Sequence, residues 1–378
     1  MNLFEVYPKF DISLQKAKGV YVYDENETPY LDLYGGHGVI SIGHSQPYYV
    51  NALQRQLEKI AFYSNSVQMP LQEELAQKLG ELSGYTDYNL FLCNSGAEAN
   101  ENALKLASFH TQKRRVIAFK NSFHGRTAAA LCVTDNCKIH SPLQYDNFPV
   151  VFLDLNDEKQ FQNAFETYDD ICAVIVEGVQ GVGGLDYPSD DFLELLQTYC
   201  KKYNALLILD EIQSGFGRTG NFFAHQSNPN IRPDIITTAK GMGNGFPVAG
   251  VIIAPHIEAK HGMLGTTFGG NHLASVASLS VLEVLEKDNL MINAKEISDF
   301  LREELKSIPA IQKIKGKGLM LGVELEFPIK EIRKQLLEEF HIMTGSSANP
   351  NLLRILPPLS INKQEIKPFV EALQKILL

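Results

Sequence analysis

Seven short apolar runs, rich in Val, Ile, Leu and Phe, punctuate the middle of the chain. They read NLFLCN, RVIAFK, PVVFLDL, ICAVIVEG, ALLILDE, DIITTA and VAGVIIA, and such runs are typical of buried strands. Helical patterns lie between several of them, for example over residues 97–110 and 191–203. This alternation predicts an α/β fold with a mostly parallel seven-stranded sheet, covered on both faces, over about residues 85 to 255.

The pattern changes after residue 271 to amphipathic helices with short strands between them, such as LMLGVELE and LLRILPPL. The opening stretch YVYDENETPYLDLYGGH resembles a hairpin, which is too small to be stable alone. We therefore expect a large domain at residues 56–271. A small α+β domain is expected to form from both chain ends, residues 1–55 and 272–378.

Composition narrows the class of protein. With 34 Lys+Arg against 44 Asp+Glu, the net charge is −10, which disfavours a nucleic-acid binder. The N-terminal MNLFEVYPKFDISLQ lacks the basic and apolar regions of a signal peptide, and no apolar run is long enough to span a membrane. The five cysteines are odd in number and widely spread, as free thiols would be. These features predict a cytoplasmic enzyme without a membrane or nucleic-acid partner.

Ligands of open parallel sheets bind at the carboxyl ends of the strands, so the residues after each run matter most. The stretch NSGAEANE follows the first run and enters a helix. Ser95 is expected to cap that helix with Glu98 three residues later, and Gly96 lets a ligand approach the backbone. Helix N-termini bind phosphate well, although an ordinary strand-to-helix turn has the same features.

Two charged residues complete a possible cofactor site. Asp210 ends the run ALLIL, where a carboxylate serves as an N-cap, a metal ligand or a partner for a cationic ring; without a nearby His/Cys/Asp cluster, a metal is disfavoured. Lys240 follows DIITTA, and desolvation there would lower its pKa and free the amine as a nucleophile. A phosphate-binding turn, a carboxylate and a buried lysine together fit pyridoxal phosphate.

Six motifs then identify a family resemblance. NSGAEANENALKLA, SFHGRT, residues 177–184, LILDEIQSGFGRTG, TTAKGMGNGFP and GTTFGGN occur in the order and spacing of the class III (ornithine-type) pyridoxal-phosphate aminotransferases. The resemblance extends from about Tyr21 to the C-terminus and is strongest to the acetylornithine-type members, with the ornithine and 4-aminobutyrate types close. It implies a fold-type I transferase that forms a homodimer, with active sites at the subunit interface.

The resemblance also implies roles for single residues. Lys240 is expected to bind the cofactor aldehyde and then to shuttle a proton, while Asp210 keeps the ring nitrogen protonated. Arg126 is expected to bind the substrate carboxylate through its guanidinium fork, with Thr266 and Glu177 facing the substrate. The residues expected to bind the cofactor are Ser95, Gly96, Ala97, Phe123, His124, Asp210, Glu211, Ile212, Gln213, Lys240 and, from the other subunit, Thr267.

Residues 177–184 depart from the family pattern. Most relatives read Glu-Pro-Val/Ile-Gln-Gly-Glu-Gly-Gly, whereas this chain reads EGVQGVGG, so Val182 replaces the second acidic residue. In relatives that glutamate pairs with an arginine corresponding to Arg354. An unpaired buried arginine is unfavourable, so either another acid compensates or an anionic substrate group binds it. We hypothesise an amino donor with an extra carboxylate, such as N-succinylornithine.

The expected reaction moves the terminal amino group of an N-acylated ornithine, N-acetyl- or N-succinylornithine, to 2-oxoglutarate by a ping-pong mechanism. The products are the semialdehyde and glutamate, as in arginine biosynthesis. Tyr63 in AFYSN is closer to the ornithine type, and His37 lies where relatives vary with substrate, so ornithine and 4-aminobutyrate stay open as donors. An aminomutase and a catalytically silent pyridoxal-fold binding protein are the alternatives from other classes.

Overall fold

The computed structural model describes residues 1–141 and 148–377. Its centre is a seven-stranded sheet in the order β4-β10-β9-β8-β7-β5-β6. All strands from β9 to β6 run parallel, whereas β10 is antiparallel to both of its neighbours. The seven apolar runs and the mostly parallel sheet are thus confirmed. The strands are β4 Asn89–Cys93, β5 Arg115–Phe119, β6 Val150–Leu153, β7 Ile171–Glu177, β8 Leu206–Asp210, β9 Ile235–Thr238 and β10 Ala249–Ile253.

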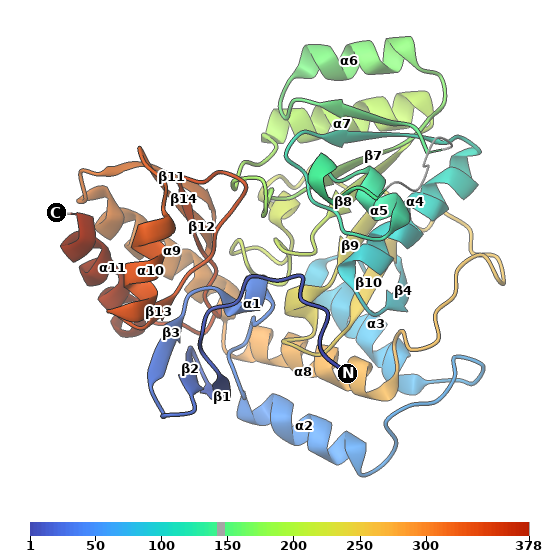
Figure 1. Ribbon diagram of the computed structural model, residues 1–378. Coiled ribbons are helices and arrows are strands. Elements are labelled where there is room, and N and C mark those ends of the chain that lie inside the picture. Colours follow the sequence, from blue (N-terminus) through green and yellow to red (C-terminus); the bar gives the residue numbers. More distant parts are fainter. Residues whose placement is uncertain (142–147, 378) are drawn as a thin grey trace.

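Helices cover both faces of this sheet, because alternate residues of each strand point to opposite sides. Val116 and Ala118 of β5 pack with α4 (Gly96–Thr111), whereas Ile117 and Phe119 pack with α6 (Glu158–Thr167) and α7 (Asp190–Tyr203). Figure 1 shows α6 and α7 on one side of the sheet and α4 with the short α5 (Ala128–Cys132) on the other. The helices expected at 97–110 and 191–203 are therefore α4 and α7.

The two chain ends meet in a smaller α+β region, on the left of Figure 1. β3 near the N-terminus pairs in parallel with β13 near the C-terminus, so neither end forms this sheet alone. A second, antiparallel sheet has the order β11-β12-β14. The elements are β1 Leu14–Lys18, β2 Tyr21–Asp24, β3 Pro29–Asp32, α9 Leu290–Lys306, β11 Ile311–Lys317, β12 Met320–Leu325, α10 Lys330–Glu338, β13 Ile342–Met343, β14 Leu352–Ile355 and α11 Lys363–Leu377.

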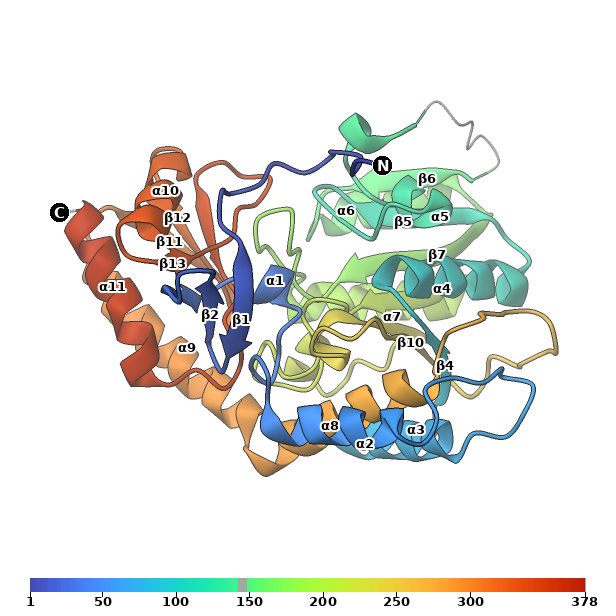
Figure 2. The same cartoon turned by 60° about the horizontal axis from the view of Figure 1, so that its bottom comes forward.

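A further group of helices shares a hydrophobic core with β4, β9 and β10. α8 (His272–Lys287) packs along α2 (Pro47–Leu57) and α3 (Pro70–Ser83), as Figure 2 shows at the bottom of the view. One hydrophobic core includes residues of α3, α8, α9 and α11, so it continues across the expected boundary at residue 272. The division at residues 56 and 272 stays a prediction. The remaining short elements are α1 Gly35–Gly38, η1 Cys137–Ile139, η2 Ala224–Ser227 and η3 Lys240–Met242.

Candidate active site

A cavity of ≈ 860 Å³ lies at the carboxyl ends of the parallel strands, where it meets α1 and residues 346–348. Its lining includes most of the residues that the sequence predicts for the site. These are His37, Ser95, Gly96, Ala97, Phe123, His124, Arg126, Glu177, Asp210, Ile212, Gln213, Lys240 and Arg354. Four predicted residues, Tyr63, Glu211, Thr266 and Thr267, do not belong to the lining that the described residues form.

The carboxylate of Asp210, the last residue of β8, is held by three donors. Asn100 Nδ2 donates to Oδ2 over 2.8 Å, His124 Nδ1 lies 2.7 Å from the same oxygen, and the backbone N–H of Ile212 donates to Oδ1 over 3.0 Å. Asn100 is itself oriented by the hydroxyl of Thr237, 2.7 Å away. The arrangement fixes a buried carboxylate at the base of the cavity, where it can pair with a cationic group.

Lys240 follows β9 and begins the 3-10 turn η3. Its φ of +45° lies in the left-handed region, which is uncommon for a residue with a side chain and clusters at functional sites. Burial lowers the pKa of Lys240, and the repulsion of Arg354 adds to this, whereas Asp210 and Glu177 oppose it. A lowered pKa makes the neutral, nucleophilic amine more accessible.

The N-terminus of α4 forms another wall of the cavity. Ser95 Oγ accepts a hydrogen bond from the N–H of Glu98, and the Glu98 carboxylate accepts one from the N–H of Asn94 over 2.9 Å. This confirms the predicted cap of Ser95 with Glu98. A Cβ at Gly96 would lie 2.8 Å from the side chain of Ile212, so the close approach of this turn to the loop after β8 requires glycine. The first N–H groups of α4 have no intrahelical partner and suit an anion.

Glu177 ends β7 and connects two walls of the cavity. Its carboxylate accepts hydrogen bonds from the N–H of Phe123 over 2.9 Å and from the N–H of Gly181 over 3.0 Å. Burial raises the pKa of Glu177 to about 7, with a smaller increase from Asp210, while His124 and the two N–H donors act in the opposite direction. Glu177 thereby positions Phe123 while its own carboxyl group lines the cavity.

Two arginines line the same cavity in different surroundings. Arg126 is exposed, whereas Arg354 is 3 % exposed and comes from β14 in the smaller region. Arg354 Nη1 donates to the carbonyl oxygen of Gly181 over 2.6 Å, and its guanidinium lies 5.9 Å from the ring centre of Tyr34. Within residues 1–141 and 148–377, no carboxylate forms an ion pair with Arg354, and its Nε has no hydrogen-bond partner. The cavity is therefore suited to bind carboxylates.

The predicted residues outside the cavity have other contacts. Glu211 accepts hydrogen bonds from Ser214 and from the N–H groups of Ala224 and His225, so its carboxylate lies within the protein core. Thr266 Oγ1 accepts from Asn94 Nδ2 over 3.1 Å. Tyr63, Thr267 and the neighbouring Phe268 are exposed on loops.

Several residues at the cavity or behind its wall were not predicted from the sequence, among them Tyr34, Tyr7 and Asn100. Tyr34 and Tyr7 line the cavity from the N-terminal part of the chain, and Asn100 holds Asp210 from behind. The sequence does contain a signal for Asn100, because this residue belongs to the NSGAEANE motif, four residues after Gly96. Tyr7 carries no comparable signal, since its segment shows neither the alternation of a strand nor the 3.6-residue periodicity of a helix.

The family model Aminotransferase class-III matches residues 5–377. The chain belongs to this family. It is 41% identical to the acetylornithine aminotransferase of Bacillus subtilis (strain 168), with 100% of this chain and 97% of that protein covered. It is 36% identical to the LysW-aminoadipate semialdehyde/glutamate semialdehyde transaminase of Sulfurisphaera tokodaii, with 99% and 97% covered. The structure of the ornithine aminotransferase from Toxoplasma gondii superimposes with a TM-score of 0.89 at 28% identity, covering 98% of this chain and 91% of that one.

This aminotransferase has the fold-type I architecture, and its family implies pyridoxal phosphate as cofactor. The cavity fits that group. A lysine amine of lowered pKa, a fixed carboxylate and a helix N-terminus are the three partners that its aldehyde, ring nitrogen and phosphate need. Within the part of the chain that the structure describes, no group of three His, Cys, Asp or Glu residues could hold a metal ion, and none of the helices is long and apolar enough to cross a membrane.

Proposed function

We propose that this aminotransferase moves the terminal amino group of an N-acylated ornithine to 2-oxoglutarate, giving the semialdehyde and glutamate. The name of the Bacillus subtilis relative supports an acylated ornithine, because the two chains align over their whole length. The Sulfurisphaera tokodaii relative, named for two semialdehydes, supports a donor of similar chemistry. The main structural support for this substrate is that Arg126 and Arg354 line the same cavity as Lys240.

Pyridoxal phosphate, when bound, supplies an aldehyde for the amine and a ring that withdraws electrons from the reacting carbon. Lys240 would provide the amine that holds the cofactor, and the same amine would serve as the base that moves a proton at the substrate carbon. Asp210 would pair with the ring nitrogen of the bound cofactor, and three donors hold both of its oxygens in place. Phe123, whose backbone is held by Glu177, would pack against the cofactor ring, and Gln213, which lines the same cavity, would bond the ring hydroxyl.

The two arginines divide the recognition of carboxylates. Arg126 is exposed at the cavity and binds the α-carboxylate of the substrate by a bidentate contact. Arg354 is buried and already bonded on one side to the Gly181 carbonyl, so it offers its remaining donors in a fixed direction. Val182, which also lines the cavity, brings no charge to compete for them. We propose that the acyl group of the donor carries a carboxylate that binds Arg354, as a succinyl group does.

We further propose a cytoplasmic homodimer whose partner subunit completes the site with Thr267. Thr267 precedes Phe268, which is 60% exposed and packs its ring 5.3 Å from that of the exposed Phe62. Figure 2 shows the loop between α2 and α3 beside the loop that precedes α8, at one edge of the molecule. An exposed aromatic pair next to a predicted cofactor residue is typical of an interface. Four of the five free cysteines are buried, which fits a reducing compartment.

A donor panel tests this function. Purified holoenzyme is given 2-oxoglutarate with N-acetylornithine, N-succinylornithine, ornithine or 4-aminobutyrate, and glutamate is measured. We expect the highest kcat/KM with N-succinylornithine and none without 2-oxoglutarate, since an aminomutase would need no keto acid. Equal or higher kcat/KM with N-acetylornithine would refute the carboxylated acyl group. As a control, Lys240→Ala should abolish turnover and the absorbance of the lysine-bound cofactor.

A further inference from the structure

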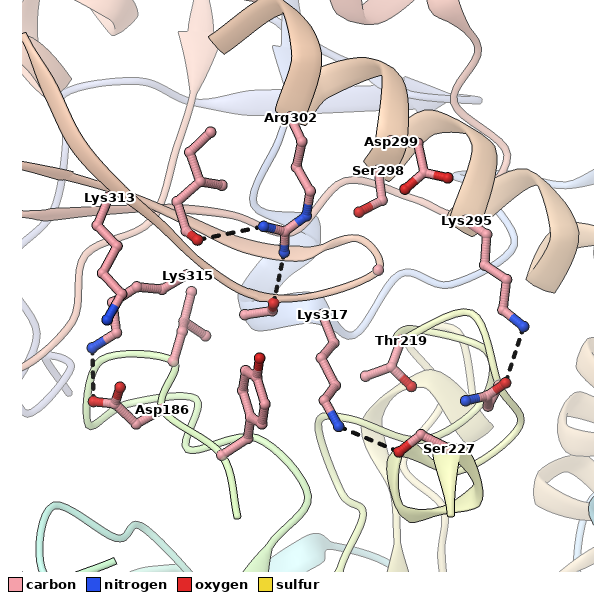
Figure 3. Close-up of a pocket in the computed structure, with 16 residues that line it drawn as sticks. Asp186, Thr219, Ser227, Lys295, Ser298, Asp299, Arg302, Lys313, Lys315 and Lys317 are labelled. Atoms are coloured by element: carbon pink, nitrogen blue, oxygen red, sulfur yellow. Dashed lines mark hydrogen bonds and ion pairs between the residues drawn. The ribbon is translucent and has the colours of Figure 1, made fainter. Parts of the chain in front are cut away.

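A second cavity of ≈ 600 Å³ lies between the two regions of the chain, away from the active site. Figure 3 shows its walls: residues 185–187 and 219–227 on one side, and α9 with the β11–β12 hairpin on the other. It shares no lining residue with the active-site cavity. Its size is in the range of small-molecule sites.

The lining of this second cavity is strongly basic. Lys295, Arg302, Lys313, Lys315 and Lys317 face two acids, Asp186 and Asp299, so the local balance is 5 − 2 = +3. The whole chain has a net charge of −10, so the cavity is opposite in sign to the protein around it. A concave basic wall with little acid to neutralise it raises the local concentration of anions.

Some of these cations are already paired and others are available. Lys315 forms an ion pair of 2.7 Å with Asp186, and Arg302 donates to the carbonyl oxygen of Gly316 over 2.7 Å, so both have structural roles. Lys317 Nζ donates to Ser227 Oγ over 3.3 Å, and Lys295 Nζ donates to Asn221 Oδ1 over 3.1 Å.

Neither Lys295 nor Lys317 forms an ion pair with any carboxylate of the described residues. Lys317 also lies 4.5 Å from the ring centre of Tyr187. Burial lowers the pKa of Lys317, whereas Asp190 and Glu211 act to raise it. An anion in the cavity would favour the charged form of the lysine in the same way.

A buried hydroxyl lies beside the two available lysines. Thr219 is 7% exposed, and within residues 1–141 and 148–377 its Oγ1 has no hydrogen-bond partner. In Figure 3, Thr219 and Ser227 lie between Lys317 and Lys295, which reach in from the hairpin and from α9. A buried hydroxyl without a partner is unfavourable unless a bound molecule supplies one.

The wall that carries Thr219 is held firmly against the hairpin. The N–H of Leu319 donates to the carbonyl oxygen of Arg218 over 2.9 Å. Gly318 has a φ of +54°, and a Cβ there would lie 2.4 Å from the backbone of Thr219, so the turn can approach only as glycine. The donors are thus arranged before any ligand binds, which reduces the entropy lost on binding.

We propose that this cavity is a binding site for a small anion with two or more negative charges, held by Lys295, Lys317, Thr219 and Ser227. The site goes beyond the proposed transamination, because it needs neither the cofactor nor the substrates. Two lysines from separate elements favour a ligand with charges at both ends over a monovalent ion. Phosphate esters and polycarboxylates share this chemistry.

The test is calorimetric titration of the holoenzyme with pyrophosphate and, separately, with citrate at matched ionic strength. The loaded enzyme is used because its cofactor already fills the phosphate site of α4. We expect binding with one or both probes, and the probe that binds more tightly identifies the phosphate or the carboxylate class. Lys295→Gln with Lys317→Gln should weaken it about tenfold or more, since hydrogen bonds to charged groups are strong.

Two further variants distinguish binding at this cavity from a general effect of the protein's positive charges. Lys334→Gln with Lys367→Gln removes the same charge from exposed helix positions and should leave the affinity unchanged. Thr219→Val keeps shape and charge but removes the hydroxyl, and should weaken binding severalfold. The proposal would be overturned if the wild type bound neither probe, or if both double variants weakened binding equally. It would also be overturned if binding were lost only in Arg126→Gln, which would place the anion in the active site.

Discussion

Arg354 Nη1 lies 2.6 Å from the carbonyl oxygen of Gly181, the residue directly before Val182. A glutamate at position 182 would therefore lie beside a buried guanidinium. We predict that Val182→Glu lowers kcat/KM for N-succinylornithine about tenfold or more relative to N-acetylornithine, because the new carboxylate competes for Arg354. Val182→Gln, which has the same length without the charge, should change the ratio much less. An unchanged donor profile in Val182→Glu would contradict the role given to Arg354.

The contact of Asn100 with Asp210 predicts a positioning role that the sequence did not reveal. We expect Asn100→Leu to lower kcat about tenfold with little change in KM, because the carboxylate loses one of the donors that orient it. The pH dependence of the cofactor absorbance should shift as well, which a purely structural role would not cause. Asn102→Leu on the same helix is the control, since among the described residues its side chain donates to the Glu98 carbonyl of its own helix and makes no contact with Asp210. Equal effects of both variants would count against positioning.

The buried carboxyl group of Glu177 leads us to expect that the free energy of unfolding depends on pH. Burial raises its pKa to about 7 from an ordinary 4.5, so the folded chain binds this proton more tightly than the unfolded chain. Its contribution to stability is full below about pH 4.5 and is lost as the pH rises through about 7. The free energy of unfolding of the apoprotein, compared with that of Glu177→Gln, should therefore decrease across this window in urea titrations.

The control for this pH series is Glu194→Gln. Hydrogen bonds from Asn228 and Asn230 lower the pKa of Glu194, so it titrates below the window. Its variant should keep the wild-type slope between about pH 5 and about pH 8. Parallel curves for wild type and Glu177→Gln would show that the raised pKa of Glu177 is wrong.

The buried side chain of Arg218 leads us to expect a large effect of its replacement on stability. It is 2% exposed, and its guanidinium donates to the carbonyl oxygens of Leu319, Pro357 and Ile40, which come from both ends of the chain. Arg218→Met fills similar space but removes the donor from three carbonyls, two of them in buried contacts, so we expect the free energy of unfolding to fall by about 3 kcal/mol or more. Arg232→Met, at an exposed ion pair with Asp87, should cost about 1 kcal/mol or less in the same denaturant titration. Similar losses would argue against this role.

The proposed sharing of the site between subunits predicts complementation. A heterodimer is prepared by co-expressing a Lys240→Ala chain and a Thr267→Ala chain with different tags. One of its two sites contains both native residues only if Thr267 acts on the site of the partner subunit. We expect the purified heterodimer to exceed the activity of either homodimer. If Thr267 acts within its own subunit, no site of the heterodimer is complete. The activity of the heterodimer then does not exceed that of the Thr267→Ala homodimer.

Much of the fold was predictable because its signals are local. Each of the seven strands lies within a continuous apolar run, which buried parallel strands require. Ser95 and Glu98 revealed the start of α4 through a cap that needs only neighbours in sequence. β1 and β11 were missed, because these edge strands read LQKAK and IQKIKGK and contain no continuous apolar run.

The sequence by itself determined the strand ends, and with them that Asp210 and Lys240 lie at one edge of the sheet. Tertiary structure alone decided which neighbouring side chains belong to the site. Glu211 follows Asp210 directly, yet its carboxylate is buried with Ser214 and His225, because successive residues leave the strand in different directions. Arg354 and Gly181, 173 residues apart, meet only because the chain ends fold back on the sheet. Contacts between distant segments depend on packing, which no local pattern encodes.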